Sequence, residues 1–299
     1  MSKSETARRG VAEAYLAPDV RERVPTTPAL ADQLGVSLGT VHAAITGLEH
    51  DGLITTTARG PKGRWLVERD VLGLWDASGR GAPTGVLPLP ESGEMAGLAT
   101  ALKSASERRG VTLQLLFRQG GLHRLEALDS GRVDFVVTSL SLALARSDSA
   151  DNLPLLPHSY YETGALVVIT PREGAHEPPR TVAADPASAD NYAMTQREFP
   201  GVPIVEKSYM LIPASVADHE VDAAVWHRTT PSPLMVAAGL AVRPLRQPAF
   251  SDLDEVNRAA LVWRKHDRAV GRVLREIFDP VEIEAVQREV LQGRTAPRF

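Results

Sequence analysis

Apolar residues recur at helical spacing early in the chain and in short β-branched runs later. Leu30, Leu34, Val41, Ile45 and Leu48 are separated by three, four or seven residues, which is typical of helices with one buried face. Beyond residue 85, β-branched runs alternate with helical periodicity in a βαβα order. That order predicts an α/β domain of parallel strands covered by helices.

The pattern divides the chain into a head at residues 1–75, a linker at 76–85 and a larger domain at 86–299. Residues 76–85 are rich in Gly, Ser and Pro, a composition typical of flexible connectors. The head is expected to begin with a helix at 4–16. In the larger domain we expect strands at 86–89, 111–117, 133–138, 165–170, 202–206, 222–226 and 259–263, and helices at 94–109, 122–130, 190–198, 266–277 and 281–291.

Residues 28–48 carry the signals of a helix-turn-helix. Pro28 suits the start of a helix, and Gly35 suits a left-handed turn residue after it. Ser37 can cap a second helix that follows the turn at once. We expect that second helix to enter a major groove of double-stranded DNA.

A β-hairpin wing is expected after the two helices. Arms at 53–57 and 64–67 flank a Gly-Pro-Lys-Gly turn. Arg59, Lys62 and Arg64 lie at its tip, where basic groups can contact phosphates and supply salt-dependent affinity.

Composition narrows the function classes. The 299 residues carry a net charge of −4, and nine basic residues balance nine acidic ones within residues 1–75. No cysteine is present, which excludes disulfides, thiolate metal sites and a thiol nucleophile. No signal-peptide core and no membrane span is evident, so we expect a cytoplasmic protein without membrane contacts.

The segment from about 10 to 68 resembles the winged helix of GntR-type regulators, through Leu-Gly-Val-Ser, Leu-Glu-x-x-Gly-Leu-Ile and the basic wing. GntR heads often carry arginines on the second helix, whereas this chain has Leu38 and His42 there. Direct reading of guanine by arginine is therefore doubtful. The alternative is a winged helix used for protein contacts or dimerisation. The expected DNA-binding residues are Ser37, Thr40, His42, Thr46, Arg59, Lys62 and Arg64.

The larger domain contains two acidic strand entries, Gly-Arg-Val-Asp134 and Glu-Val-Asp222. These segments resemble the type II periplasmic-binding-protein fold, in which two lobes close on a solute. We interpret Asp134 and Asp222 as structural groups at strand starts rather than ligand contacts. Ligands of open α/β sheets settle outside the carboxyl ends of the strands.

Loops between strands and helices supply the ligand-binding candidates, because helix N-termini offer free amides to anions. Arg118, beside two glycines, is the first choice for pairing with a carboxylate or phosphate. The alternative role for Arg118 is a surface or interlobe salt bridge. We interpret His158 as a hinge or strand residue rather than a ligand contact. The expected set is Ser92, Gly93, Arg118, Gly120, Gly121, Thr138, Ser139, Asn191, Ser208, Tyr209 and Trp226.

Nearly the whole chain resembles the YhfZ family of GntR-like regulators. The resemblance rests on 87–90 (Leu-Pro-Leu-Pro), 117–120 (Phe-Arg-Gln-Gly), 157–160 (Pro-His-Ser-Tyr), 188–190 (Ser-Ala-Asp), 208–209 (Ser-Tyr) and 221–226 (Val-Asp-Ala-Ala-Val-Trp). It implies a solute-binding-like effector domain but supplies no ligand.

We therefore expect a ligand-responsive transcription regulator that binds operator DNA as a homodimer and senses a small, anionic metabolite. No metal-binding, P-loop, dinucleotide or nucleophile-elbow motif appears, so neither a cofactor nor an enzymatic activity is expected. Two alternatives stay open: an enzyme fused to a DNA-binding head, and a winged-helix adaptor for protein partners.

Overall fold

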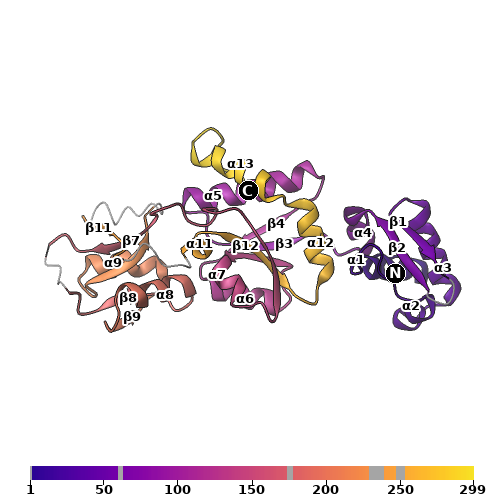
Figure 1. The fold of residues 1–299 in the computed structure, drawn as a ribbon, viewed down its shortest axis with the longest axis horizontal. Helices are drawn as coiled ribbons and strands as arrows, with labels where there is room; N and C mark the ends of the chain where they lie inside the picture. The colour runs from indigo at the N-terminus through magenta and orange to yellow at the C-terminus, as the bar shows by residue number, and fades with distance from the viewer. Residues whose placement is uncertain (1, 60–62, 174–177, 229–238, 247–252) are drawn as a thin grey trace.

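The computed structural model describes residues 2–59, 63–173, 178–228, 239–246 and 253–299. Three units follow one another along the long axis (Figure 1). A helical head lies at one end, and two units that each contain a five-stranded sheet follow it. We call the middle unit lobe 1 and the far unit lobe 2.

The head contains three helices, a hairpin and a fourth helix. Thr26 caps the second helix, Gly35 ends it with a left-handed φ of 63°, and the Ser37 hydroxyl accepts a bond from Thr40 N at the start of the third. Their apolar faces pack inward around buried Leu30 and Ile45. The elements are α1 (Lys3–Leu16), α2 (Thr27–Leu34), α3 (Leu38–His50), β1 (Ile54–Ala58), antiparallel β2 (Arg64–Arg69) and α4 (Val71–Ser78).

Half of the expected linker at 76–85 is built into neighbouring elements. Residues 76–78 finish helix α4, and Thr84 begins the first strand of lobe 1. Asp70 caps α4 by accepting from Gly73 N, and the helix buries Leu74 and Trp75 against α1. Only residues 79–83 remain irregular. Of the Gly and Ser residues that suggested a linker, Ser78 ends α4 and Gly79 caps it, while Gly81 lies in the irregular stretch.

Lobe 1 has the strand order β4-β3-β5-β12-β6. Strand β3 is parallel to β4 and β5, whereas β12 is antiparallel to β5 and β6, so the expected all-parallel sheet is wrong and the sheet is mixed. Its elements are β3 (Thr84–Leu87), α5 (Gly93–Arg108), β4 (Gln114–Phe117), α6 (Gly121–Asp129), β5 (Phe135–Ser139), α7 (Leu140–Leu144), β6 (Ala150–Pro154), α11 (Leu253–Val256), β12 (Ala259–Arg264), α12 (Arg268–Ile277) and α13 (Pro280–Leu291).

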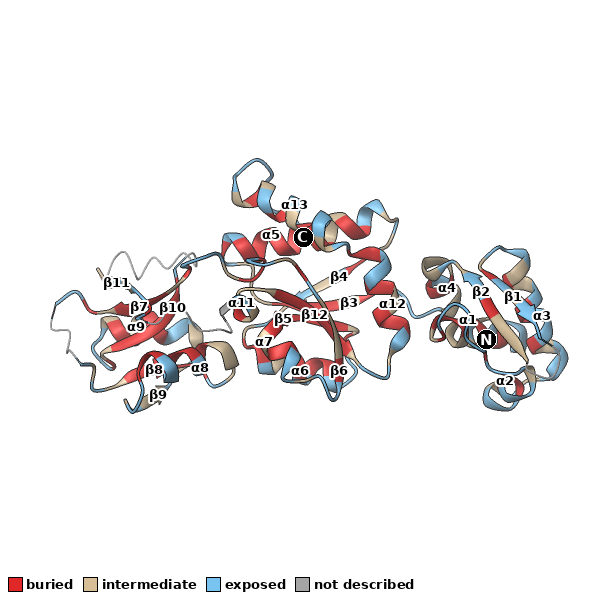
Figure 2. Cartoon of the chain, in the orientation of Figure 1, coloured by how far each residue is buried: buried red, intermediate tan, exposed pale blue. Residues whose placement is uncertain are grey.

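Lobe 2 has the strand order β11-β7-β10-β8-β9. Strand β10 is parallel to β8 and antiparallel to β7, which also pairs with β11 in antiparallel fashion. The central strands of both sheets are largely buried, whereas the edge strands β4, β6, β9 and β11 are mostly half-buried or exposed (Figure 2). The elements are β7 (Leu166–Thr170), β8 (Val182–Ala184), α8 (Ala189–Glu198), β9 (Ile204–Glu206), the 3₁₀ turn η2 (Tyr209–Leu211), α9 (Ile212–Ala217), β10 (Ala223–His227) and β11 (Ala241–Pro244).

The two acidic residues at strand entries are structural, as interpreted from the sequence. The Asp134 carboxylate accepts from Thr84 N at 2.8 Å, and the Asp222 carboxylate accepts from Arg180 N at 2.7 Å and Thr181 N at 3.1 Å. Both therefore hold neighbouring strands together. His158 lies where the chain first crosses between the lobes and has a φ of 65°.

Candidate functional site

A cavity of about 60 Å³ lies between lobes 1 and 2. It sits at the carboxyl ends of the parallel strands β3 and β4, where open α/β sheets bind ligands. We call it the cleft. Its lining consists of Pro88, Leu89, Glu91, Ser92, Met95, Gln119, Gly120, Gly121, Arg124, Tyr160, Tyr161, Ser188, Ala189, Asp190, Tyr209 and His227.

Arg124 is the fixed cation of the cleft. Its side chain is buried, and its three guanidinium nitrogens donate to Val137 O at 2.8 Å, Arg118 O at 2.9 Å and the Tyr160 hydroxyl at 2.9 Å. Arg124 lies three residues after Gly121, so both occupy one face of the first turns of α6. The hydrogen bonds hold the guanidinium in one orientation beside the cavity.

Asp190 reaches the cleft from lobe 2, at the start of α8. Burial raises the pKa of its carboxyl, while a hydrogen bond with Ser139 and the charge of Arg124 oppose that rise. Ser139 belongs to lobe 1, so this hydrogen bond joins the two lobes. A carboxyl group with a raised pKa stays protonated, and so can donate a hydrogen bond, up to a higher pH than an exposed aspartate.

Aromatic and ionisable side chains complete the wall. The Tyr161 ring lies 4.8 Å from that of Tyr160 and 4.7 Å from that of His227. His227 Nε2 is 3.5 Å from the buried Glu94 carboxylate. Burial raises the pKa of the Tyr161 and Tyr209 hydroxyls, which therefore stay protonated as hydrogen-bonding groups.

The lobes touch directly beside the cleft. Leu122 N, at the start of α6, donates to Ala187 O of lobe 2 at 3.1 Å. Gly120 has a φ of 85°, and a Cβ built on it would lie 3.0 Å from Ala187 Cβ and 3.1 Å from Ala187 O. A residue without a side chain is therefore needed for this approach. The structure is a closed arrangement of the two lobes.

Four of the expected ligand-binding residues line the cleft: Ser92, Gly120, Gly121 and Tyr209. Asn191 instead donates to Val225 O and accepts from Asp185 N within lobe 2. Ser139 caps α7 and bonds Asp190, and Trp226 stacks on Tyr209 with ring centroids 4.4 Å apart. Outside the lining lie Gly93, Arg118, Thr138, Ser139, Asn191, Ser208 and Trp226.

Arg118, the first choice from the sequence, points away from the cleft. Its side chain is 43% exposed, donates to His123 O at 3.1 Å and lies 3.9 Å from the Glu126 carboxylate. The surface salt bridge left open as the alternative is what the structure contains. Arg124 lines the cleft where Arg118 was expected. The sequence did not indicate Arg124, because an arginine within a helix is usually solvent-exposed. The sequence signal for a buried Arg124 is its position on the side of α6 that carries the apolar residues Leu125 and Leu128.

The expected DNA-binding residues divide into exposed and internally bonded groups. His42 and Thr46 are exposed on α3, whereas Ser37 caps that helix and its hydroxyl pairs with the Thr40 hydroxyl at 2.8 Å. Arg59 stacks over the Trp65 ring at 4.8 Å. Lys62 lies outside the described residues.

Arg64 does not project from the hairpin as expected. Its Nη1 donates to the Glu49 carboxylate at 2.8 Å and to the Thr56 hydroxyl at 2.5 Å, which fastens the hairpin to α3. Arg23 was not considered from the sequence, yet its guanidinium lies 3.0 Å from the position of a Cβ on Gly63. Arg59 and Arg23 are thus the cations that flank the described part of the hairpin tip.

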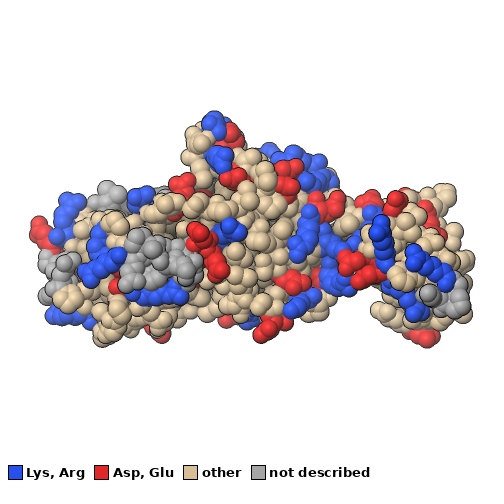
Figure 3. Space-filling model, viewed as in Figure 1, with Lys and Arg blue, Asp and Glu red and all other residues tan. Residues whose placement is uncertain are grey.

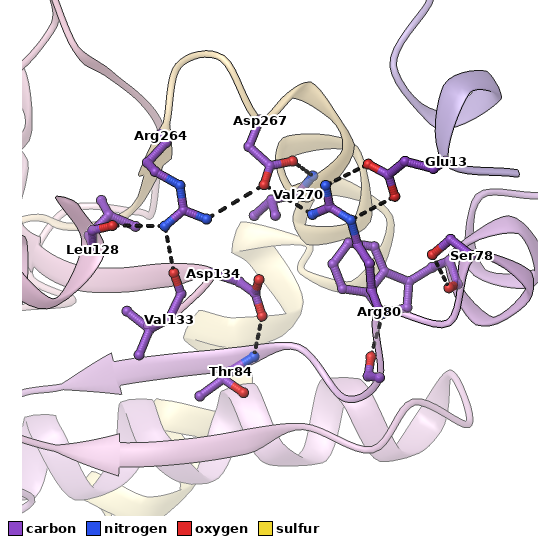
Figure 4. Close-up of polar contacts among 12 residues, drawn as sticks. Glu13, Ser78, Arg80, Thr84, Leu128, Val133, Asp134, Arg264, Asp267 and Val270 are labelled. Atoms are coloured by element: carbon purple, nitrogen blue, oxygen red, sulfur yellow. Dashed lines mark hydrogen bonds and ion pairs between the residues drawn. The ribbon is translucent and has the colours of Figure 1, made fainter. Parts of the chain in front are cut away.

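The head joins lobe 1 through a chain of charged groups (Figure 4). Arg80 donates to the Glu13 carboxylate of α1 at 2.6 and 2.7 Å and to Asp267 at 3.0 Å. Asp267 caps α12 and lies 3.6 Å from Arg264, whose Nη1 donates to Leu128 O and Val133 O at 2.8 Å each. We call this chain, Glu13–Arg80–Asp267–Arg264, the junction network.

The family of the chain follows from a match to its larger C-terminal region. The model of the YhfZ C-terminal domain matches residues 70–299, which is more than half of the chain. The chain belongs to the YhfZ family. It is 29% identical to the YhfZ protein of Escherichia coli (strain K12) over 283 residues, which cover 93% of this chain and 91% of that protein.

Solved structures support the same family and its fold. The crystal structure of YhfZ from Shigella flexneri matches with a TM-score of 0.62 and 25% identity, covering 77% of this chain and 98% of that one. The alkanesulfonate-binding protein SsuA of Xanthomonas axonopodis pv. citri, bound to MOPS, matches with a TM-score of 0.52 and 16% identity over 72% of this chain and 75% of that one. Beyond the head, this YhfZ family member thus forms a two-lobed, periplasmic-binding-protein-like α/β domain.

Within the described ranges, no helix combines the length and the apolar character that crossing a lipid bilayer requires.

Proposed function

We propose that this YhfZ family member is a cytoplasmic, ligand-responsive transcription regulator without enzymatic activity. Its head acts as a winged helix-turn-helix on double-stranded DNA, and a small-molecule effector binds in the cleft of the type II-like domain. Two copies bind a palindromic operator as a homodimer, with the lobes setting the separation of the heads.

The observation that carries this proposal is the position of α6. Its first turn contributes Gly121 and Arg124 to the cleft, and its last turn contributes the Leu128 carbonyl to Arg264 of the junction network. One rigid helix therefore touches both the ligand site and the chain of contacts that reaches α1 of the head. A ligand that favours one position of α6 also favours one arrangement of the junction network, which is the physical requirement for coupling two sites.

An anionic effector is supported by the polar groups at one end of the cleft. Arg124 carries a fixed positive charge, and the N-terminus of α6 begins at Gly120 without a side-chain cap. Leu122 N is already bonded to Ala187 O, so the helix dipole and the charge of Arg124 are what favour a negative group there. The neutral form of Asp190 can donate a hydrogen bond from the opposite lobe. The effector must be small, because the closed cavity measures about 60 Å³.

DNA binding can be tested with the cations beside the hairpin. Arg59→Ala and Arg23→Ala should each weaken binding to duplexes of any sequence and should reduce the slope of log K against log salt by about 1. The measurement is fluorescence anisotropy of a labelled duplex across a salt series. Arg132→Ala, an exposed arginine of lobe 1, should leave both quantities unchanged. Unchanged slopes in both head variants would contradict the assigned DNA surface.

Effector binding can be tested on the native protein. Mass spectrometry of the solute released on denaturation identifies a candidate, and calorimetry then measures its affinity for the chain and for Asp190→Asn. Arg264→Met should leave that affinity in place while removing the effect of the solute on DNA binding, because it breaks the junction network. Chemical conversion of the solute by the protein would contradict the non-enzymatic assignment.

A further inference from the structure

The exposed face of α3 has no fixed charge. Its outward residues are Leu38, Gly39, His42, Ala43, Thr46 and His50, and the helix contains no lysine or arginine. The acidic groups at its C-terminal end, Glu49 and Asp51, are engaged by Arg64 and Arg8. The face is therefore a mixture of apolar and neutral polar groups.

Leu38 is the unusual residue of this face. It occupies the first position of α3, directly after the Ser37 cap, and its exposed fraction is 55%. A single exposed leucine has no meaning by itself. This one lies in the first turn of the second helix of a helix-turn-helix, the part that faces base edges in such motifs. Ala43 and the methyl group of Thr46 extend its apolar character along the helix.

The surroundings of this face indicate which partner it suits. Arg59 and Arg23 lie at the hairpin, adjacent to α3 through the Glu49–Arg64 contact. An apolar face flanked by cations is complementary to a groove whose floor presents methyl groups and whose rims are phosphates. The major groove of duplex DNA has this arrangement at A·T pairs, where the thymine C5-methyl projects into the groove.

We propose that α3 reads thymine methyl groups, with Leu38 as the principal contact, so that the operator carries A·T pairs at the positions facing the first turn of the helix. This inference rests on the proposed DNA-binding function. The commonest guanine contact, a bidentate one from arginine or lysine, is not available from α3.

Substitution of uracil for thymine tests the proposal, because uracil keeps the pairing and the hydrogen-bonding groups and lacks only the methyl. Duplexes that the full-length chain enriches from a random-sequence library serve as probes, and single thymines are then replaced by uracil. Each contacted methyl should contribute about fourfold to affinity, the value expected for burying one methyl-sized group. The measurement is competition fluorescence anisotropy at fixed salt.

Leu38→Ala should bind the same duplex more weakly and lose the sensitivity to uracil at the position that Leu38 contacts. Leu116→Ala, which removes a comparably exposed leucine from β4 of lobe 1, should keep the wild-type sensitivity. Thermal unfolding of each variant checks that the fold is retained.

The outcomes separate the two proposals. Specific binding in which no thymine-to-uracil exchange alters affinity overturns methyl reading and leaves DNA binding intact. Sensitivity that persists in Leu38→Ala overturns the assignment to that residue. If no duplex is bound at all, the proposed function fails and this inference fails with it.

Discussion

The molecule contains two joints of different character. The joint between head and lobe 1 combines an apolar cluster that both units share with ion pairs, and the ion-paired part, the surface joint, includes exposed pairs such as Arg268 with Asp19, whose side chains are 48% and 55% exposed. Figure 3 shows basic and acidic side chains gathered where these two units meet. The joint between lobes 1 and 2 is buried, and Arg124 and His227 there are 2% and 3% exposed.

The difference indicates how free energy is distributed between the two joints. Exposed ion pairs are screened by salt and stabilise by about 1 kcal/mol or less. Buried hydrogen-bonded groups are costly to separate, because each broken contact leaves a desolvated partner. In the proposed function a ligand acts on the buried joint, whereas the exposed ion pairs of the surface joint are the contacts that can rearrange at low cost.

The largest effect is expected from Gly120→Ala at the buried joint. The added Cβ meets Ala187, and alanine disfavours the backbone conformation, so we expect the closed form to lose about 2–4 kcal/mol. The radius of gyration from small-angle scattering should rise, and effector affinity should fall more than tenfold. Gly131→Ala is the matched control, because Gly131 has a φ of 72° and nothing within 4 Å of an added Cβ. Equal effects of the two variants would mean that interlobe contact is not the cause.

Arg80→Met should have the next largest effect, at the most buried part of the surface joint. Arg80 and Asp267 are 27% and 10% exposed, and the change removes hydrogen bonds to both Glu13 and Asp267. We expect a loss of about 1–3 kcal/mol, the range for hydrogen bonds to charged groups. A double-mutant cycle with Glu13→Gln, in which each variant is unfolded by chemical denaturant, measures the coupling free energy between Arg80 and Glu13. A coupling energy of zero would show that the junction network does not hold the head.

The pH dependence of stability should have opposite signs for a buried carboxyl group and for a carboxylate that accepts hydrogen bonds from arginines. Because burial raises the pKa of Asp190 above its ordinary 3.8, its stabilising contribution is present below that value and is lost as the pH rises through the raised pKa. Asp190→Asn should remove this loss. Glu282→Gln provides the opposite case, because hydrogen bonds from Arg109 and Arg108 lower the pKa of Glu282, whose contribution is lost as the pH falls. Thermal unfolding of both variants from about pH 3 to 7 tests the contrast.

The smallest effect is expected from Arg268→Ala at the exposed edge of the surface joint. Its pairs with Asp19 at 2.8 Å and Glu22 at 3.5 Å should stabilise by under about 1 kcal/mol. The difference between variant and wild type in chemical denaturation should vanish at about 1 M salt, where the screening length is only ~3 Å. A difference that survives high salt would place this pair with the buried contacts.

Helix positions were largely predictable from the sequence, while strand direction was not. The apolar spacing and the Ser37 cap located α3, and the two long C-terminal helices were placed within a few residues. The antiparallel insertion of β12 between β5 and β6 depends on a pairing about 120 residues apart, which local periodicity does not encode. Helix α4 was missed, because its last turn (residues 76–78) lies in the segment interpreted as a linker.

Side-chain orientation limited the prediction of the candidate site. Loops at strand ends were located correctly, since Ser92, Gly120, Gly121 and Tyr209 line the cleft. The choice between Arg118 and Arg124 depends on which way two neighbouring arginines point, and only the packed helix determines that. Arg64 was misjudged for the same reason, because its partner Glu49 lies on another element.

The return of the chain to lobe 1 has a consequence for how the protein is made. Strand β12 follows all of lobe 2 in the sequence, yet it pairs with β6, and Pro154 is the register partner of Ala260. Lobe 2 is therefore an insertion whose two ends meet at adjacent strands. On a ribosome the head can fold early, whereas lobe 1 must wait for β12, the strand between β5 and β6. A chain shortened before residue 259 would thus lose the platform that carries the head, while excision of lobe 2 with a short turn in its place would preserve it.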